Sequence, residues 1–180
     1  PRIAFVNKMD RAGANFLRCV DQIRTRLKGN PVVIQLPIGA EENFSGIVDL
    51  VRMKASTYEP GGVGKAREVE IPAELSEAAN KAHEALVEMV AEGNDKLMEE
   101  FFEKGTLPVE DLTKGLREAI QKKRLYPVLL SSALKNIGSI AIALVFEQQV
   151  ELEAGRAGRN RTLQRDAVAH RAALVAGHVA

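Results

Sequence analysis

Asn7, Lys8 and Asp10 have the types and spacing to recognise a nucleobase, and they follow directly on the apolar run 2–6. An ionised Asp offers only hydrogen-bond acceptors, so it suits a ligand edge with two adjacent N–H donors. The ring N1–H and exocyclic amino group of guanine form such an edge, whereas adenine has none. Lys8 can lay its aliphatic stem along a flat base, and Asn7 can brace neighbouring loops. These residues predict a guanine-binding edge, but they are equally compatible with a strand that ends in a polar turn.

A strand, a helix and a second strand are expected to position this edge. The run 2–6 is short, apolar and contains β-branched residues, which is typical of a buried strand. Apolar residues recur at helical spacing from 16 to 27, residues 29–31 stop the helix, and 32–36 read as the next strand. Such a unit builds a parallel sheet. Because ligands of open α/β sheets bind beyond the carboxyl ends of the strands, residues 7–10 are expected at a binding edge.

The span from residue 37 to residue 123 is far longer than a crossover requires, so it is expected to carry structure of its own. Alternating residues around a glycine-rich turn predict a β-hairpin over 45–71. Apolar stripes at helical spacing predict three helices, over 75–92, 95–103 and 106–124. His83 lies in the first of these helices without a second ligand at metal spacing, so we expect a structural role for it.

Three runs of the sequence closely resemble bacterial translation elongation factor G. They are Asn-Lys-Met-Asp-Arg-Ala-Gly-Ala-Asn-Phe (7–16), Gln-Leu-Pro-Ile-Gly-Ala-Glu-Glu (35–42) and Ser-Ala-Leu-Lys-Asn (132–136). The resemblance covers roughly residues 1–138. It implies an α/β fold in which the C-terminal part of a P-loop GTPase-type parallel sheet carries an inserted α+β subdomain.

The same resemblance implies a division into domains. Residues 1–36 and 124–146 would form part of a GTP-binding domain, its guanine-reading half, and residues 37–123 would form the inserted subdomain. Residues 147–180 are expected to be an aberrant or disordered tail. The resemblance also implies that the guanine-binding residues are Asn7, Lys8, Asp10, Ser132, Ala133 and Leu134. Asp10 would hold the base donors, Asn7 and Lys8 would order and cover the site, and Ser132 and Ala133 would face the guanine oxygen through their backbone N–H groups.

The resemblance implies GTP and GDP as ligands, and GTP hydrolysis coupled to movement of tRNA and mRNA through the ribosome. Hydrolysis requires a phosphate-binding loop, a metal-holding Thr/Asp pair and a residue that orients water, and the sequence contains none of them. The run 61–65 has the glycines and a lysine but lacks the following Ser/Thr, so a hairpin turn is expected there. We therefore expect no catalytic residue and no metal site in this chain, with Mg²⁺ bound only in the full-length protein.

Composition constrains the partners only weakly. The 25 basic and 24 acidic residues give a net charge of +1, too small to indicate nucleic-acid binding. The resemblance implies the ribosome as partner, through the large-subunit stalk protein and ribosomal RNA. The single cysteine, Cys19, cannot form an internal disulfide, and we expect it to be a packing residue. With no signal peptide and no long apolar run, we expect a cytoplasmic protein without a membrane or DNA partner. The alternative function is a stand-alone ribosome-binding module without GTPase activity.

The two ends of the chain do not follow the family pattern. The sequence begins with Pro1 and enters a strand at once, so we expect a fragment. After Gly138 the composition changes: the last lysine is Lys135, whereas five arginines lie between residues 156 and 171. Our hypothesis is that the reading frame slips near residues 138–146. The alternative is a basic tail that touches RNA, although it has no aromatic residue for base stacking after Phe146.

Overall fold

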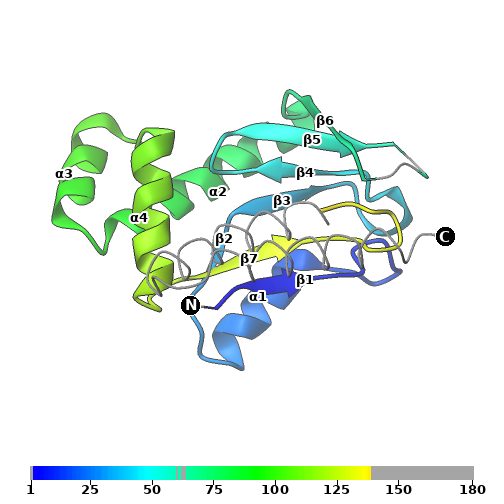
Figure 1. Ribbon diagram of the computed structural model, residues 1–180, viewed down its shortest axis with the longest axis horizontal. Helices are drawn as coiled ribbons and strands as arrows, with labels where there is room; N and C mark the ends of the chain where they lie inside the picture. The colour runs from blue at the N-terminus through cyan, green and yellow to red at the C-terminus, as the bar shows by residue number, and fades with distance from the viewer. Residues whose placement is uncertain (1, 60, 62–63, 139–180) are drawn as a thin grey trace, which may run out of the picture. The chain divides into compact units, whose positions relative to one another are not determined.

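Three parallel strands form one of the two sheets in the computed structural model, which describes residues 2–59, 61 and 64–138 (Figure 1). They lie in the order β1–β7–β2, and their bounds are β1 Ala4–Val6, β7 Tyr126–Leu130 and β2 Pro31–Val33. The register pairs Val6 with Leu130. Because the strands are parallel, β1 and β7 end at the same edge. The predicted α/β fold, with part of a parallel sheet and a separate α+β portion, is confirmed.

Helix α1 (Phe16–Thr25) follows the loop after β1 and begins at an asparagine cap. Asn15 Oδ1 accepts a hydrogen bond from the N–H of Arg18 at 2.9 Å, which satisfies one of the free N–H groups of the first turn. The apolar stripe was expected to continue to Leu27, but the helix ends earlier and Leu27 is 75% exposed. Lys28 then has a left-handed φ of 52°, which turns the chain out of the helix.

The stretch 32–36 was expected to be one strand, but it is divided between two sheets. Its first part belongs to β2, whereas β3 (Gln35–Ile38) pairs in the antiparallel sheet. Ile34 lies between them, and its carbonyl accepts a hydrogen bond from the N–H of Leu50 at 3.0 Å. A continuous apolar run cannot indicate where the pairing partner changes.

The antiparallel sheet has the order β3–β4–β5–β6, with β4 Gly46–Asp49, β5 Lys54–Tyr58 and β6 Ala66–Val69. The short 3-10 helix η1 (Glu41–Asn43) connects β3 to β4. The hairpin predicted over 45–71 is confirmed around its glycine-rich turn, because β5 and β6 pair antiparallel with Tyr58 opposite Ala66. Its first arm, expected as one strand from 45 to 58, is instead divided into β4 and β5, which pair with each other. The glycine-rich run between them therefore joins two strands and does not lead from a strand into a helix, as a phosphate-binding loop does.

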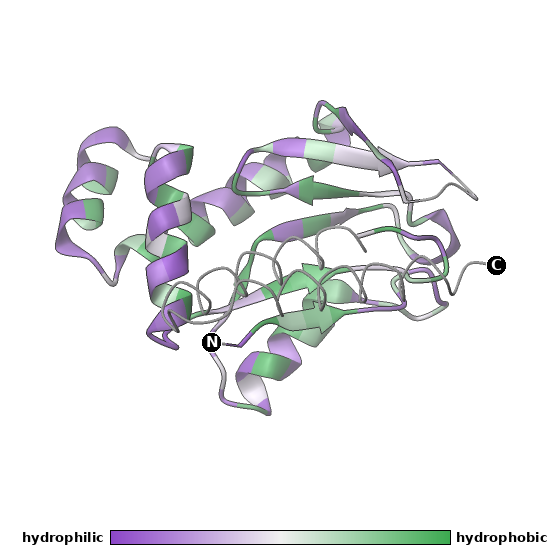
Figure 2. Ribbon diagram, viewed as in Figure 1, coloured by the Kyte–Doolittle hydropathy of each residue, from purple (hydrophilic) through white to green (hydrophobic). Residues whose placement is uncertain are grey.

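All three predicted helices are present, as α2 Ala73–Ala91, α3 Asp95–Lys104 and α4 Val109–Gln121. The apolar stripes of α2 and α4 are buried, and the polar residues of these helices lie outward (Figure 2). A Cβ on Gly115 of α4 would lie 2.6 Å from Leu97 Cδ1 and 2.7 Å from Val90 Cγ1. This glycine lets α4 approach its two neighbours closely.

Two polar side chains tie α2 to the rest of the fold. The guanidinium of Arg124 donates to the carbonyls of Met89 at 2.9 Å and Val90 at 3.0 Å, which satisfies free carbonyls in the last turn of α2. His83 Nδ1 donates to the carbonyl of Leu50 at 2.7 Å. His83 therefore has the structural role that the sequence predicted.

The tail expected at 147–180, and the part of 124–146 beyond residue 138, lie outside the described residues. The division into domains stays a prediction. Within the described part of the chain, no helix combines the length and the apolar character needed to cross a membrane.

Candidate functional site

The loops after β1 and β7 leave the parallel sheet at the same edge and are hydrogen-bonded to each other. The N–H of Ser131 donates to the carbonyl of Val6 at 2.9 Å, and the N–H of Met9 donates to the carbonyl of Ser131 at 3.2 Å. Met9 is also buried, with 2% of its surface exposed. The two sequence motifs at 7–10 and 132–134 therefore meet at one place, as expected for the carboxyl ends of adjacent parallel strands.

Asn7 connects the two loops through a single oxygen. Its Oδ1 accepts hydrogen bonds from the N–H of Lys8 at 2.7 Å, the N–H of Ala133 at 3.2 Å and Ser131 Oγ at 3.4 Å. The first bond lies within the first loop and the other two come from the second loop. A side chain that accepts from both loops fixes their spacing.

Asp10 is held by Ser132, which is fully buried. Ser132 Oγ donates a hydrogen bond to Asp10 Oδ1 and accepts one from the N–H of Lys135 at 3.1 Å. The hydrogen bond from Ser132 lowers the pKa of Asp10 below its usual value of 3.8, the positive charges of Lys135 and Arg11 act in the same direction, and burial opposes them. Asp10 is therefore an ionised acceptor near neutral pH.

Lys8 and Leu134 are the exposed members of the site. Lys8 adopts a left-handed φ of 64° directly after the strand and its turn residue Asn7, and it is solvent-exposed. Leu134 is 84% exposed. A long aliphatic stem and an apolar side chain next to an acceptor carboxylate are suited to contact the faces of a flat ring.

The backbone N–H groups of Ser132 and Ala133 were expected to face a base oxygen, but both donate to acceptors within the protein. Ser132 and Ile137 form an isolated antiparallel bridge, in which the N–H of Ser132 donates to the carbonyl of Ile137 at 3.0 Å. The N–H of Ser132 is therefore not directed at a ligand, because the loop must close on itself before it leaves the sheet. The N–H of Ala133 donates to Asn7 Oδ1 at 3.2 Å, a bond that a base oxygen would have to share or replace.

A pocket of about 320 Å³ lies between the first loop and α1. Asn7, Lys8 and Cys19 are among the residues that line it, whereas Asp10 and residues 132–134 are not. The pocket therefore does not include the acceptor carboxylate. Cys19 is half-buried there and not fully packed, in contrast to the expectation.

Sequence reasoning missed two residues that connect this site to the antiparallel sheet. Glu41 of η1 accepts a hydrogen bond through Oε1 from the N–H of Gly13 at 2.8 Å. The ammonium of Lys135 donates to the carbonyls of Glu42 and Phe44, the latter at 3.1 Å. These contacts join residues 28 to 93 positions apart, and local sequence patterns carry no signal for them.

Metal binding has no support in the described residues. No group of three or more His, Cys, Asp or Glu side chains within residues 2–59, 61 and 64–138 lies close enough to hold an ion. The expectation that Mg²⁺ is bound only in the full-length protein stays a prediction.

No protein-family model matches the chain. It is similar to a crystal structure of a protein from Thermus thermophilus, with 30% sequence identity and a TM-score of 0.69. The match covers 81% of this chain but only 21% of that chain. The chain thus spans about a fifth of the length of the Thermus thermophilus protein that it matches.

Proposed function

We propose that this chain is the guanine-reading part of a translational GTPase related to bacterial elongation factor G. In the full-length protein, GTP hydrolysis would be coupled to movement of tRNA and mRNA through the ribosome. The ligands would be GTP and GDP, with Mg²⁺ held by residues outside this chain. The partners would be the large-subunit stalk protein and ribosomal RNA, and the protein would act in the cytoplasm.

The observation that carries this proposal is the ionised Asp10 carboxylate, oriented by Ser132 at the joint edge of β1 and β7. A carboxylate in this state accepts two hydrogen bonds from one ligand edge, and guanine offers its N1–H and amino group side by side. Lys8 and Leu134 are both exposed beside it and can cover the base. Adenine presents an acceptor at N1 and is disfavoured by the same carboxylate.

The test is an NMR titration of the ¹⁵N-labelled 180-residue chain with GMP, with AMP as the matched control. Amide shifts are expected at residues 7–10 and 132–134, saturable with GMP and absent with AMP. Asp10→Ala is expected to weaken GMP binding by about tenfold or more, because two base donors lose their acceptor. Equal responses to the two nucleotides, or an Asp10→Ala variant that binds GMP normally, would contradict the proposal.

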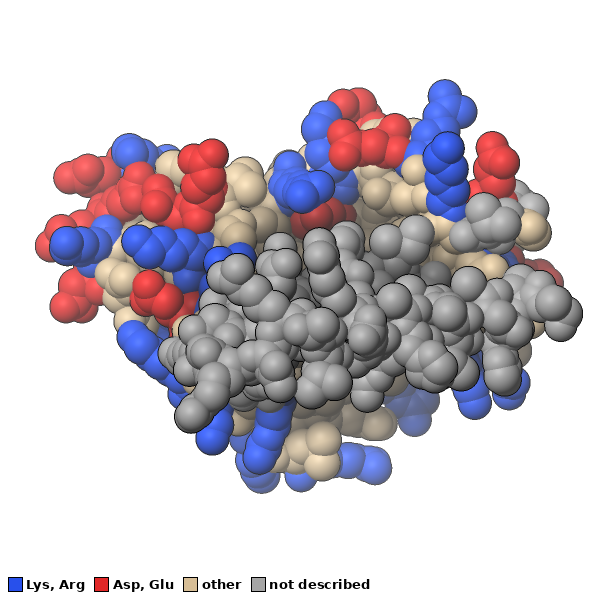
Figure 3. Space-filling view, in the orientation of Figure 1, with Lys and Arg blue, Asp and Glu red and all other residues tan. Residues whose placement is uncertain are grey.

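The alternative, a stand-alone ribosome-binding module, is favoured by the surface of α3. This helix has no fully buried residue, Phe102 on it is 78% exposed, and Asp and Glu side chains gather over α3 and α4 with Lys and Arg among them (Figure 3). Aromatic residues often anchor protein–protein contacts, and Phe102 would be the anchor on this surface. This function predicts co-sedimentation with ribosomes that Phe102→Ala abolishes and Asp10→Ala leaves unchanged.

A further inference from the structure

The loop that carries Asp10 and the loop that carries Ser132 are both hydrogen-bonded to the same short stretch of the antiparallel subdomain, η1 and the Phe44 that follows it. We infer that η1 positions the base-reading loops, with Glu41 and Lys135 as the positioning residues. This inference rests on the proposed function and adds to it a route by which the inserted subdomain sets guanine affinity.

The first loop is anchored through Glu41. Its carboxylate accepts from the N–H of Gly13, three residues beyond Asp10. Two turn hydrogen bonds link that position back to the site, from the N–H of Arg11 to the carbonyl of Lys8 at 3.1 Å and from the N–H of Ala14 to the carbonyl of Arg11 at 3.0 Å. Gly13 itself has a φ of 78° and nothing within 4 Å of the position of a Cβ, so the hydrogen bond to Glu41 restrains a residue that has no side-chain packing of its own.

The second loop is anchored through Lys135. Its ammonium donates to the carbonyls of Glu42 and Phe44, and its backbone N–H donates to Ser132 Oγ. Ser132 in turn donates to Asp10. A continuous series of hydrogen bonds thus runs from η1 through Lys135 and Ser132 to the carboxylate that would read the base.

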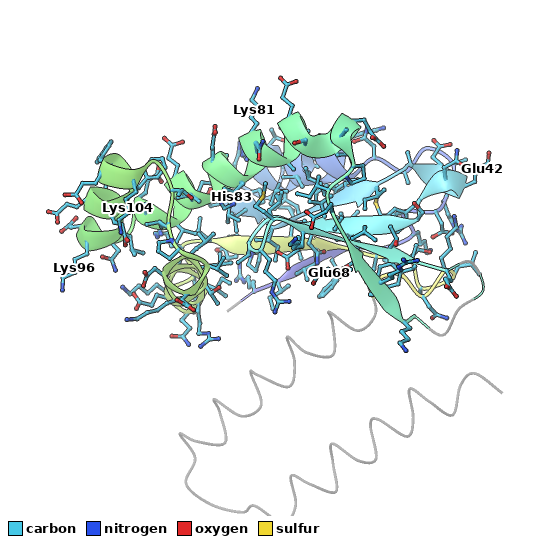
Figure 4. All side chains as sticks on the ribbon, turned by 90° about the horizontal axis from the view of Figure 1, so that it is seen from above. Glu42, Glu68, Lys81, His83, Lys96 and Lys104 are labelled. Carbon is cyan, nitrogen blue, oxygen red and sulfur yellow. The ribbon has the colours of Figure 1, made fainter. Side chains whose placement is uncertain are left out.

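The anchoring element is itself held in place. Phe44 is buried, and its N–H donates to the carbonyl of Glu41 at 3.0 Å. Gly39 precedes η1 with a φ of 75°, and a Cβ there would overlap the carbonyl oxygen of Asn43. Figure 4 shows Glu42 at the end of the molecule opposite to Lys96 and Lys104 of α3. The element therefore offers fixed acceptors to both loops.

The chain offers matched substitutions that separate positioning from folding. Glu41→Ala removes the acceptor for Gly13, whereas Glu41→Gln keeps a carbonyl oxygen at the same place. Lys135→Met removes the ammonium and keeps an unbranched apolar stem. Glu42→Ala is the control, because Lys135 uses only the backbone carbonyl of Glu42.

The experiment is the GMP titration of the full 180-residue chain by NMR, applied to these variants after thermal unfolding has shown that each is folded. Glu41→Ala and Lys135→Met are expected to weaken GMP binding about threefold to tenfold, while Glu41→Gln and Glu42→Ala bind like the wild type. Lys135→Met should also shift the amide signals of Ser132 and Asp10 before ligand is added.

Three results would overturn the inference. The first is unchanged GMP affinity in Glu41→Ala and Lys135→Met, with the wild type binding normally; the proposed function would then stand alone. The second is an equal loss in Glu41→Gln and Glu41→Ala, because the acceptor would then be irrelevant. The third is a wild-type chain without GMP-specific shifts, which refutes the proposed function and the positioning role with it.

Discussion

Ser132 Oγ donates a hydrogen bond to Asp10 Oδ1 although the two residues are 122 positions apart in the chain. The bond exists because β1 and β7 are adjacent parallel strands whose ends coincide. It lowers the pKa of the carboxylate that would read the base.

Ser132→Ala is expected to raise the pKa of Asp10 toward its usual value of 3.8, since the hydrogen bond from Ser132 is the largest cause of the lowered pKa. A carboxyl whose pKa is lower in the folded state stabilises the fold above the unfolded pKa, and this contribution is lost as pH falls through the folded pKa. Guanine binding should depend on pH in the same way. It persists as pH falls toward the folded pKa of Asp10 and is lost below that pKa. NMR titration of the Asp10 carboxyl measures the shift, and an identical pKa in the variant would contradict it.

Asp10→Asn is expected to change base preference from guanine to xanthine. An Asn side chain supplies one donor and one acceptor, which matches the 2-oxo group and N1–H of xanthine and no longer matches the two donors of guanine. GMP binding should fall by about tenfold or more, and XMP binding should rise above that of the wild type. Titration of both chains with both nucleotides checks this. Loss of GMP binding without any gain for XMP would show that Asp10 does not contact the base edge.

Gly39→Ala is expected to destabilise the fold more than Gly105→Ala. Both glycines have positive φ, 75° and 71°, so both substitutions carry a backbone cost of about 1 kcal/mol. Only at Gly39 would the new Cβ overlap backbone, at the carbonyl oxygen of Asn43, whereas nothing lies within 4 Å at Gly105. Urea unfolding measures the free energy of unfolding of both variants, and the difference between them gives the cost of the close approach at Gly39. Equal free energies of unfolding would mean that η1 relaxes without cost.

Arg124→Met is expected to lower the free energy of unfolding by about 1–3 kcal/mol, because two carbonyls at the end of α2 lose their donor. Gly93→Ala should also lower the free energy of unfolding, since its Cβ would overlap the guanidinium and would displace it from these carbonyls. Urea unfolding measures both changes. An Arg124→Met variant as stable as the wild type would mean that water replaces the guanidinium at these carbonyls.

The purified chain is expected to hydrolyse no GTP, because the sequence contains no phosphate-binding loop and no residue assigned to orient water. Release of inorganic phosphate from GTP measures this, with heat-treated chain as the blank. Release above the blank that Asp10→Ala also reduces would place a phosphate site within these residues.

The sequence predicts those parts of the fold that depend on local periodicity. The stripes in α2 and α4, the hairpin of β5 and β6 and the turn after β1 all follow from spacing and from glycine, proline and asparagine positions. It does not predict the break at Ile34, because both neighbouring strands are apolar and only their partners differ.

The residues of the candidate site also divide into those that the sequence predicts and those that it does not. Asn7 and Asp10 are identifiable from residue type and spacing, because acceptor chemistry is a property of the side chain itself. Glu41 and Lys135 are not, because Glu41 receives a backbone N–H from a distant loop and Lys135 uses backbone carbonyls of a distant element. The resemblance implies that the N–H of Ser132 faces a ligand, but this N–H donates to the carbonyl of Ile137.

The pocket beside α1 makes Cys19 a natural reporter. It is the only cysteine of the chain, half-buried, and shares the pocket wall with Asn7 and Lys8. A thiol-reactive fluorophore would therefore attach at one position, beside the loop after β1 that lines the same pocket. Its emission would follow in real time whether that loop moves when a nucleotide arrives, without any engineered labelling site.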